Sequence, residues 1–144
     1  DEPFKVLDPS AGTGIFAQSF VEAFENLQNS GLIPDEAILQ IDSIEPEPIS
    51  FAILQSLQNK FPNPSIKLNS YQGKFENFAV TDERKYDVIS SNIPFGKFKI
   101  QDHVLQKEIE LTENPLIHSY FFLKSNLFLK NIISMSWAAF RLKT

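Results

Sequence analysis

The sequence has 144 residues, 42% hydrophobic and 22% charged, which is the size and composition of one ordinary domain. It contains no Cys and two His, which excludes a disulfide framework, a thiolate metal site and a Cys nucleophile and argues against a His-based metal centre. The formal net charge of -5 argues against tight electrostatic binding of nucleic acid by this chain alone. No apolar run approaches the roughly 18 residues of a membrane span. We therefore expect a soluble, cytoplasmic protein without a metal.

Hydrophobic periodicity predicts strands that alternate with amphipathic helices. The predicted strands are Phe4–Leu7, Ala37–Ile44, Ser65–Leu68 and Tyr86–Ser90, with Asn131–Phe140 as a candidate fifth. The predicted helices run from Phe16 to near Gly31, from Pro48 to before Pro62, and from Leu116 to about Leu129. This alternation is typical of a parallel sheet with right-handed crossovers and helices on both faces. We predict a three-layer, doubly wound α/β fold.

Unusual residues follow the first two predicted strands. Ligands of open α/β sheets bind beyond the carboxyl ends of the strands. The segment Asp8-Pro9-Ser10-Ala11-Gly12-Thr13-Gly14 places a carboxylate before a loop of small residues that opens a helix. Backbone can approach a ligand closely there, and free helix N–H groups can bind a carboxylate or phosphate. Glu45 follows the second strand, where it can accept hydrogen bonds from both hydroxyls of a ribose, so we predict a nucleoside-containing cofactor.

These residues alone leave two alternatives open. Residues 12–17, Gly-Thr-Gly-Ile-Phe-Ala, also fit the dinucleotide fingerprint G-x-G-x-x-G/A. An acidic residue after the second strand is equally expected in that fold, so NAD remains a candidate cofactor. The same small residues also suit a tight turn that binds no ligand.

The segment Asn92-Ile93-Pro94-Phe95-Gly96, after the fourth predicted strand, indicates a site for a planar amine. The Asn92 side-chain oxygen and the Ile93 carbonyl can accept the amino protons, and Phe95 can stack on the ring. Pro94 drives the residue before it into extended geometry, which fixes the direction of the Ile93 carbonyl. The alternative is a turn that ends a strand beside a packed Phe.

Together the two segments resemble the catalytic core of the amino-group (N6-adenine) DNA methyltransferases, which use S-adenosylmethionine. The likeness is greatest to the DNA methylase modules of bacterial mobile-element helicase/methylase proteins, and it covers roughly residues 4–129. The commonest family motif has Pro where this sequence has Ile93, whose backbone carbonyl is retained. The resemblance implies a class I, Rossmann-like methyltransferase fold. Residues 1–144 would form a single truncated catalytic domain, with a core at 1–130 and a tail at 131–144.

The resemblance also implies a role for each matching residue. The catalytic residues would be Asn92, Ile93, Pro94 and Phe95. The cofactor-binding residues would be Asp8, Pro9, Ser10, Ala11, Gly12, Gly14, Glu45 and Glu76. The loop would hold the methionine end of the cofactor, Glu45 its ribose and Glu76 its adenine, which Ile44 and Pro46 would flank. No metal or strong base would be needed, because hydrogen bonds to Asn92 and Ile93 favour attack by the adenine nitrogen on the sulfonium methyl group.

DNA is the expected partner, reached through regions outside this chain. The chain begins at Asp1, directly before its first strand, so we expect a piece of a longer intracellular protein without a leader. The tail lacks the Gly-rich lead expected before a fifth strand, and uncovered sheet edges and apolar faces would favour self-association. Two other functions remain open. The same site could methylate a protein glutamine or an RNA amine, or the chain could be a non-catalytic truncated remnant or assembly module.

Overall fold

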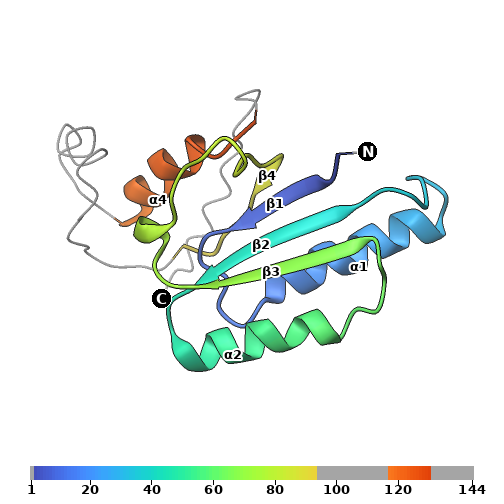
Figure 1. The fold of residues 1–144 in the computed structure, drawn as a ribbon, viewed down its shortest axis with the longest axis horizontal. Coiled ribbons are helices and arrows are strands. Elements are labelled where there is room, and N and C mark those ends of the chain that lie inside the picture. The colour runs from blue at the N-terminus through green and yellow to red at the C-terminus, as the bar shows by residue number, and fades with distance from the viewer. Residues whose placement is uncertain (1, 94–116, 131–144) are drawn as a thin grey trace, which may run out of the picture.

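A computed structural model describes residues 2–93 and 117–130 and has a parallel sheet at its centre (Figure 1). Its strands are β1 (Phe4–Asp8), β2 (Leu39–Glu45), β3 (Ile66–Gln72) and β4 (Val88–Ile89). They lie in the order β3-β2-β1-β4, and each neighbouring pair is parallel. The chain therefore extends the sheet to one side of β1 and then crosses to the other side. In open α/β sheets, ligands bind where the strand order reverses, which here is between β1 and β4.

Helices cover both faces of the sheet, so the predicted three-layer α/β fold is confirmed. The elements on one face are α1 (Ile15–Asn29), α2 (Pro48–Ser56) and the 3-10 turn η1 (Leu57–Asn59). On the other face lie α4 (Ile117–Asn126) and the 3-10 turn η2 (Phe75–Asn77). None of the helices in the described ranges has the length and hydropathy needed to cross a membrane.

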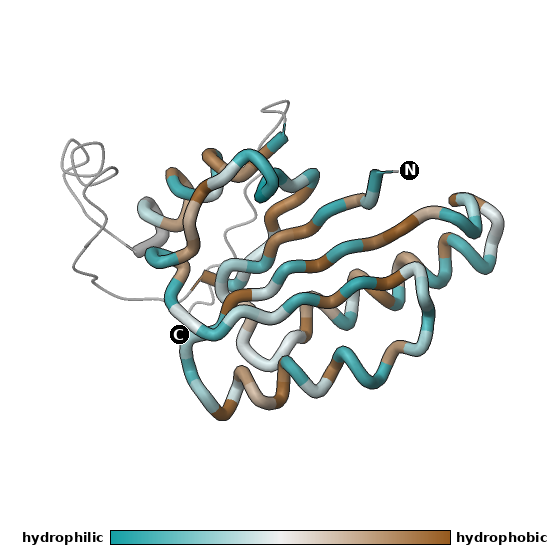
Figure 2. Tube along the Cα trace, in the orientation of Figure 1, coloured by the Kyte–Doolittle hydropathy of each residue, from teal (hydrophilic) through white to brown (hydrophobic). Residues whose placement is uncertain are grey.

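The core under α1 is mostly aliphatic. Ala17, Val21 and Phe24 lie on one stripe of the helix because they are four and three residues apart. They pack against the buried strand residues Val6, Leu39 and Ile41. Polar and apolar residues mostly alternate along β2 and β3 (Figure 2). In β1, Val6 and Leu7 are consecutive, so they point to opposite faces and supply the two layers of the core.

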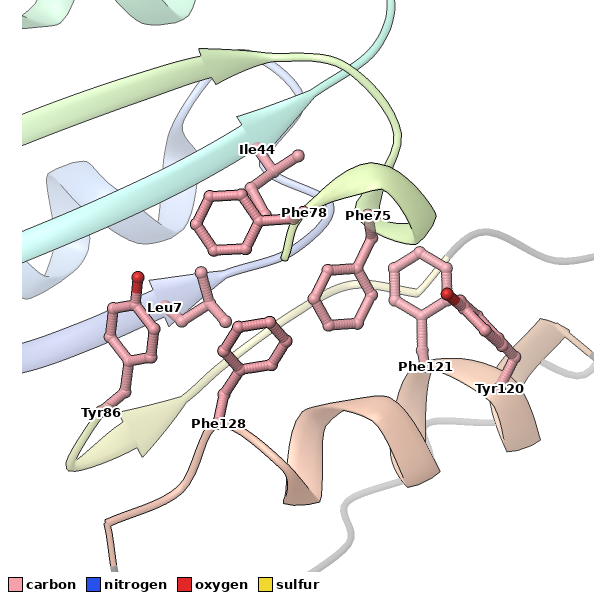
Figure 3. Packing of buried hydrophobic residues seen from close by; sticks show 8 residues of the cluster. All are labelled: Leu7, Ile44, Phe75, Phe78, Tyr86, Tyr120, Phe121 and Phe128. Carbon is pink, nitrogen blue, oxygen red and sulfur yellow. The ribbon is translucent and has the colours of Figure 1, made fainter. Parts of the chain in front are cut away.

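An aromatic cluster fills the opposite face, between the sheet, η2 and α4 (Figure 3). Its buried members are Leu7, Ile44, Phe75, Phe78, Tyr86, Tyr120, Phe121 and Phe128. The buried ammonium of Lys124 joins α4 to η2, because it donates to the Glu76 carbonyl over 2.7 Å and lies 5.1 Å from the centre of the Phe75 ring. The aromatic cluster therefore holds the α4 layer on the sheet.

A buried carboxylate in the middle of β2 connects three parts of the fold. Asp42 of β2 accepts hydrogen bonds from the Tyr86 hydroxyl over 2.6 Å and from the Asn69 amide over 2.7 Å. The Gln40 amide donates to it over 3.1 Å. Burial and the Asp42 carboxylate raise the pKa of Tyr86, which keeps its hydroxyl proton available for this bond. The network links β2, β3 and the segment before β4.

The third and fourth strands differ in length from their predictions. β3 continues to Gln72, beyond the predicted Ser65–Leu68, and pairs with the whole of β2. The β4 ladder is shorter than the predicted Tyr86–Ser90, although the Ser90 N–H still donates to the Leu7 carbonyl. The candidate fifth strand, Asn131–Phe140, lies outside the described residues.

Candidate functional site

The carboxyl ends of the strands are joined by backbone hydrogen bonds into one edge. The Ala11 N–H donates to the Ile44 carbonyl over 2.9 Å, which holds the loop after β1 against the end of β2. The Gly73 N–H donates to the Glu45 carbonyl over 3.1 Å, which adds the end of β3. The Ser90 contact to β1 adds the end of β4. The structure thus brings Asp8, the small-residue loop and Glu45 together with the segment that leads into Asn92.

Asp8 is a buried carboxyl group, 1% exposed, at the end of β1. Its Oδ1 accepts a hydrogen bond from the Ser10 N–H over 3.1 Å. Its Oδ2 is buried and has no hydrogen-bond partner among the residues that the structure describes. The pKa of Asp8 is raised to about 7. Burial is the main cause and the charge of Glu45 adds to it, while the Ser10 N–H and the nearby Ser91 hydroxyl act in the opposite direction. A ligand that brings a cation or a hydrogen-bond donor would therefore complete this group.

Glu45, the residue predicted to bind a ribose, braces the loop after β1. It is 7% exposed, and its Oε2 accepts the Gly12 N–H over 2.8 Å. Its Oε1 accepts the Glu47 N–H over 2.9 Å. The carboxylate therefore joins the loop to the start of α2, where Glu47 caps the helix by accepting from the Ile49 and Ser50 N–H groups. Each Glu45 oxygen retains a second lone pair that can accept from a ligand hydroxyl.

Gly12 and Gly14 are glycines for different structural reasons. Both have positive φ, 56° at Gly12 and 92° at Gly14, which side chains rarely adopt. A Cβ on Gly14 would lie 2.9 Å from Leu54 Cδ1 and closer still to Leu57, so this glycine lets α1 and α2 approach. A Cβ on Gly12 would meet no atom within 4 Å among the described residues. Gly12 therefore presents open backbone, with its N–H fixed by Glu45.

Gly14→Ala should lower the free energy of unfolding by at least about 2 kcal/mol, because strain at positive φ adds to overpacking against α2. Gly31→Ala is the matched control, since Gly31 also has positive φ, 68°, but its Cβ would meet no described atom within 4 Å. Gly31→Ala should lower the free energy of unfolding by only about 1 kcal/mol. Urea unfolding followed by circular dichroism measures both. Equal losses would show that close packing of α1 on α2 does not require a glycine.

The other loop residues predicted to bind the cofactor mainly stabilise the loop itself. Pro9 and Ala11 are buried, and Ala11 packs with Leu54 and Leu57 of α2 and η1. Ser10 is half-buried and donates its N–H to Asp8. These contacts hold the loop in the shape that exposes Gly12.

Of the three residues predicted to contact the cofactor adenine, two have side chains that a ligand could reach and one does not. Glu76 is half-buried in η2, beyond the end of β3. Pro46 is exposed at the end of β2. Ile44, by contrast, is 1% exposed in the aromatic cluster, so the structure does not support a contact between its side chain and a nucleobase. The spacing along β2 could not show which face of the sheet buries Ile44.

The predicted catalytic segment is described only in part. Asn92 is exposed, and Ile93 is half-buried against the aromatic cluster. Pro94 and Phe95 lie outside the described residues. Sequence reasoning missed Ser91, whose Oγ is buried beside Asp8. Its position between a strand end and Asn92 was the available signal. Within the described ranges, no three His, Cys, Asp or Glu side chains gather as metal ligands would.

Comparison with solved structures supports the fold. The chain is similar to a crystal structure described as a modification subunit of a type I restriction enzyme from Vibrio vulnificus YJ016, with a TM-score of 0.61 and 22% sequence identity. The match covers 89% of this chain and 27% of that chain. No protein-family model matches the sequence, and no curated protein matches it. The neighbour supports the α/β Rossmann-like fold.

Proposed function

We propose that this chain is the catalytic core of an S-adenosylmethionine-dependent DNA methyltransferase that acts on the N6 amine of adenine. The observation that carries the proposal is the buried Asp8 carboxyl group, whose Oδ2 lacks a described partner, beside the open backbone of Gly12. Both lie where the strand order reverses, the place where this fold binds ligands. The resemblance of residues 8–14 and 92–96 to N6-adenine methyltransferases, and the fold of the restriction-modification neighbour, support the same reading.

The residues at this edge fit the cofactor. An ammonium group provides the charge and the hydrogen-bond donor that Asp8 Oδ2 lacks. The Glu45 carboxylate can accept from ribose hydroxyls while it holds the Gly12 N–H. Glu76 and Pro46 lie beyond the ends of β3 and β2, where a nucleobase would rest. When bound, S-adenosylmethionine supplies an electrophilic methyl group, and these residues would hold and orient it.

Asn92 would orient the target amine. Its exposed side chain stands at the same edge, and Ile93 is anchored in the aromatic cluster behind it. The Asn92 oxygen and the Ile93 carbonyl would accept the two amino hydrogens of adenine, which favours a pyramidal nitrogen with an available lone pair. These two acceptors would hold the amine with its lone pair directed at the methyl group that the cofactor would supply, and water would take the proton that the amine releases. Positioning and fixed dipoles would provide most of the catalysis.

DNA binding would depend on further regions. The net charge of this chain is -5, which opposes the phosphate contacts that dominate affinity for nucleic acid. The chain also spans about a quarter of the length of the restriction-modification neighbour. We therefore place target recognition outside these residues, and activity assays need high DNA concentration and low salt.

Asn92→Ala should lower methyl transfer by about 100-fold or more, the usual effect of removing one positioned hydrogen-bonding group from an active site. Affinity for S-adenosylmethionine should change by less than about twofold, because Asn92 faces the target amine. Transfer of a radiolabelled methyl group to adenine-containing DNA measures the first quantity, and calorimetry measures the second. Asn29→Ala, at the far end of α1, is the matched control and should retain activity.

The same assay separates the alternative substrates. RNA and a glutamine-containing peptide are tested in parallel with DNA, using the same labelled cofactor. Labelling of RNA or peptide without DNA would replace adenine in DNA as the substrate while keeping the role of Asn92. Full activity of Asn92→Ala on DNA would remove this residue from the mechanism.

A further inference from the structure

An apolar pocket lies at the amino ends of β1 and β2, at the opposite end of the sheet from the candidate cofactor site (Figure 1). Its volume is about 590 Å³, which is within the range of pockets that bind small molecules. Of its lining residues, Phe24 and Leu39 are buried. Phe4 and Leu27 also line it but are 47% and 40% exposed, so the pocket opens to solvent. The proposed methyl transfer uses none of these residues.

Hydrogen bonds hold the walls of this pocket in place. The Gln28 side-chain amide donates to the carbonyls of Asp35 and Ala37 over 3.1 and 3.4 Å, which fixes the loop between α1 and β2. The Phe4 N–H donates to the Ile38 carbonyl over 2.9 Å, which joins the start of β1 to the end of that loop. Because the walls are already tied together, a ligand would need to order little of the protein when it binds.

The charged residues that line the pocket are acidic. They are Glu2 and Glu36, and neither Lys, Arg nor His is found among the described residues that line it. The Lys130 ammonium lies 2.9 Å from a Glu2 carboxylate oxygen and neutralises it in part. Glu36 is exposed and makes no ion pair with any residue of 2–93 or 117–130. The pocket therefore combines an apolar surface with an unneutralised carboxylate.

We propose that this pocket binds a small organic cation, in which an ammonium group is attached to an aromatic or branched aliphatic body. The apolar body would remove the side chains of Phe24, Ile33 and Leu39 from water, and the ammonium would lie beside the Glu36 carboxylate. Phenylalanine rings of the pocket would add to this preference, because aromatic rings attract cations that lie over their faces. An anion of the same shape would be repelled by Glu36. The site is separate from the cofactor edge, so the inference does not depend on the proposed function.

Titration of the full chain with three naphthalene compounds of similar shape tests this site. The probes are naphthylethylammonium, naphthylethanol and naphthylpropanoate, which are a cation, a neutral molecule and an anion. NMR of alanine methyl groups reports the position of binding, because Ala23 and Ala37 line the pocket and Ala11 lies at the cofactor edge. The ammonium probe should bind with a Kd of about 1 mM or tighter and shift the Ala23 and Ala37 signals without shifting that of Ala11. It should bind at least about fivefold more tightly than the propanoate, with the alcohol between them.

Two pairs of variants separate the roles of charge and shape. Glu36→Gln should reduce the ratio of ammonium to propanoate affinity at least about twofold, because it removes the carboxylate at the rim. Glu22→Gln is the matched control, since Glu22 is exposed on α1 and does not line the pocket. Ala23→Leu should weaken the binding of all three probes at least about threefold, because the larger side chain fills the pocket. Ser19→Leu, at an exposed position of α1 outside the pocket, should leave the affinities unchanged.

Four results would overturn the proposal. The first is a propanoate affinity that equals or exceeds the ammonium affinity. The second is a shift of the Ala11 signal alone, which would place the probes at the cofactor edge. The third is full affinity in Ala23→Leu, which would place them at some other surface. The fourth is a change of the Ala23 and Ala37 signals with protein concentration in the absence of a probe, which would show that a second copy of the chain covers the pocket.

Discussion

Replacing Phe128 by Ala should lower the free energy of unfolding by about 3–5 kcal/mol, the usual cost of emptying a buried aromatic site. Phe128 is fully buried, and its ring centre lies 5.7 Å from that of Phe75, 5.6 Å from Phe78 and 6.2 Å from Tyr86. The Phe128 carbonyl also accepts the Tyr86 N–H over 2.8 Å. Loss of the ring would open a cavity between the α4 layer and the sheet.

Urea unfolding, followed by far-ultraviolet circular dichroism, measures this loss. Leu127→Ala is the matched control, because Leu127 is the preceding residue and is 41% exposed. We expect its cost to be less than half that of Phe128→Ala, since part of its side chain already meets water. Equal losses of unfolding free energy in the two variants would contradict the conclusion that the aromatic cluster holds α4 on the sheet.

Asp8→Asn should stabilise the free protein near pH 8, although the residue lies in the candidate site. The pKa of Asp8 is raised by burial from 3.8 to about 7. A raised folded-state pKa gives stability that is complete below the unfolded pKa and is lost as pH rises through the folded one. The shift corresponds to at most about 4 kcal/mol at alkaline pH, and a neutral amide of the same shape avoids this cost.

The pH dependence of that gain is the sharper part of the prediction. The stabilisation by Asp8→Asn should shrink as pH falls through neutrality and be nearly zero at about pH 4, where Asp8 is protonated in the folded chain. Thermal unfolding at a series of pH values measures it. Asp35→Asn is the matched control, because Asp35 is exposed and should show no such trend. A stabilisation that does not depend on pH, or a destabilisation near pH 8, would contradict the conclusion that Asp8 is buried without a full set of hydrogen bonds.

The first half of the fold could be predicted well because its patterns are strong. The helical spacing of Phe16, Phe20, Phe24 and Leu27 predicts α1, although the residues that this helix buries are Ala17, Val21 and Phe24. β1 and β2 are short strands that end in acidic residues. The length of β3 was not predictable, because Asn69 and its polar neighbours hide the pattern. Asn69 is accommodated inside the sheet by its hydrogen bond to Asp42, 27 residues away in sequence. Such long-range partners leave no local signal.

In the candidate site, too, the local patterns were predictable and the long-range contacts were not. The general rule for strand ends placed Asp8 and Glu45 at one edge, and the structure agrees with that placement. The bracing of Gly12 by Glu45 joins residues 33 apart in sequence, and the packing of Gly14 depends on where α2 lies. The buried oxygens of Asp8 and Ser91 likewise depend on the pairing of β1 with β4. These features arise only when the elements are assembled, so residue spacing could not show them.

Calorimetric titration of the full chain with S-adenosylmethionine and, in parallel, with NAD tests the cofactor assignment most directly. We expect micromolar binding of S-adenosylmethionine, at least about tenfold tighter than NAD, and at least tenfold loss of affinity in Asp8→Asn, a difference of about 1.4 kcal/mol or more. Because Asp8→Asn should be the more stable protein near neutral pH, that loss could not come from unfolding. Preferential binding of NAD, no binding of either cofactor, or undiminished affinity in Asp8→Asn would contradict a methyltransferase cofactor site at the end of β1.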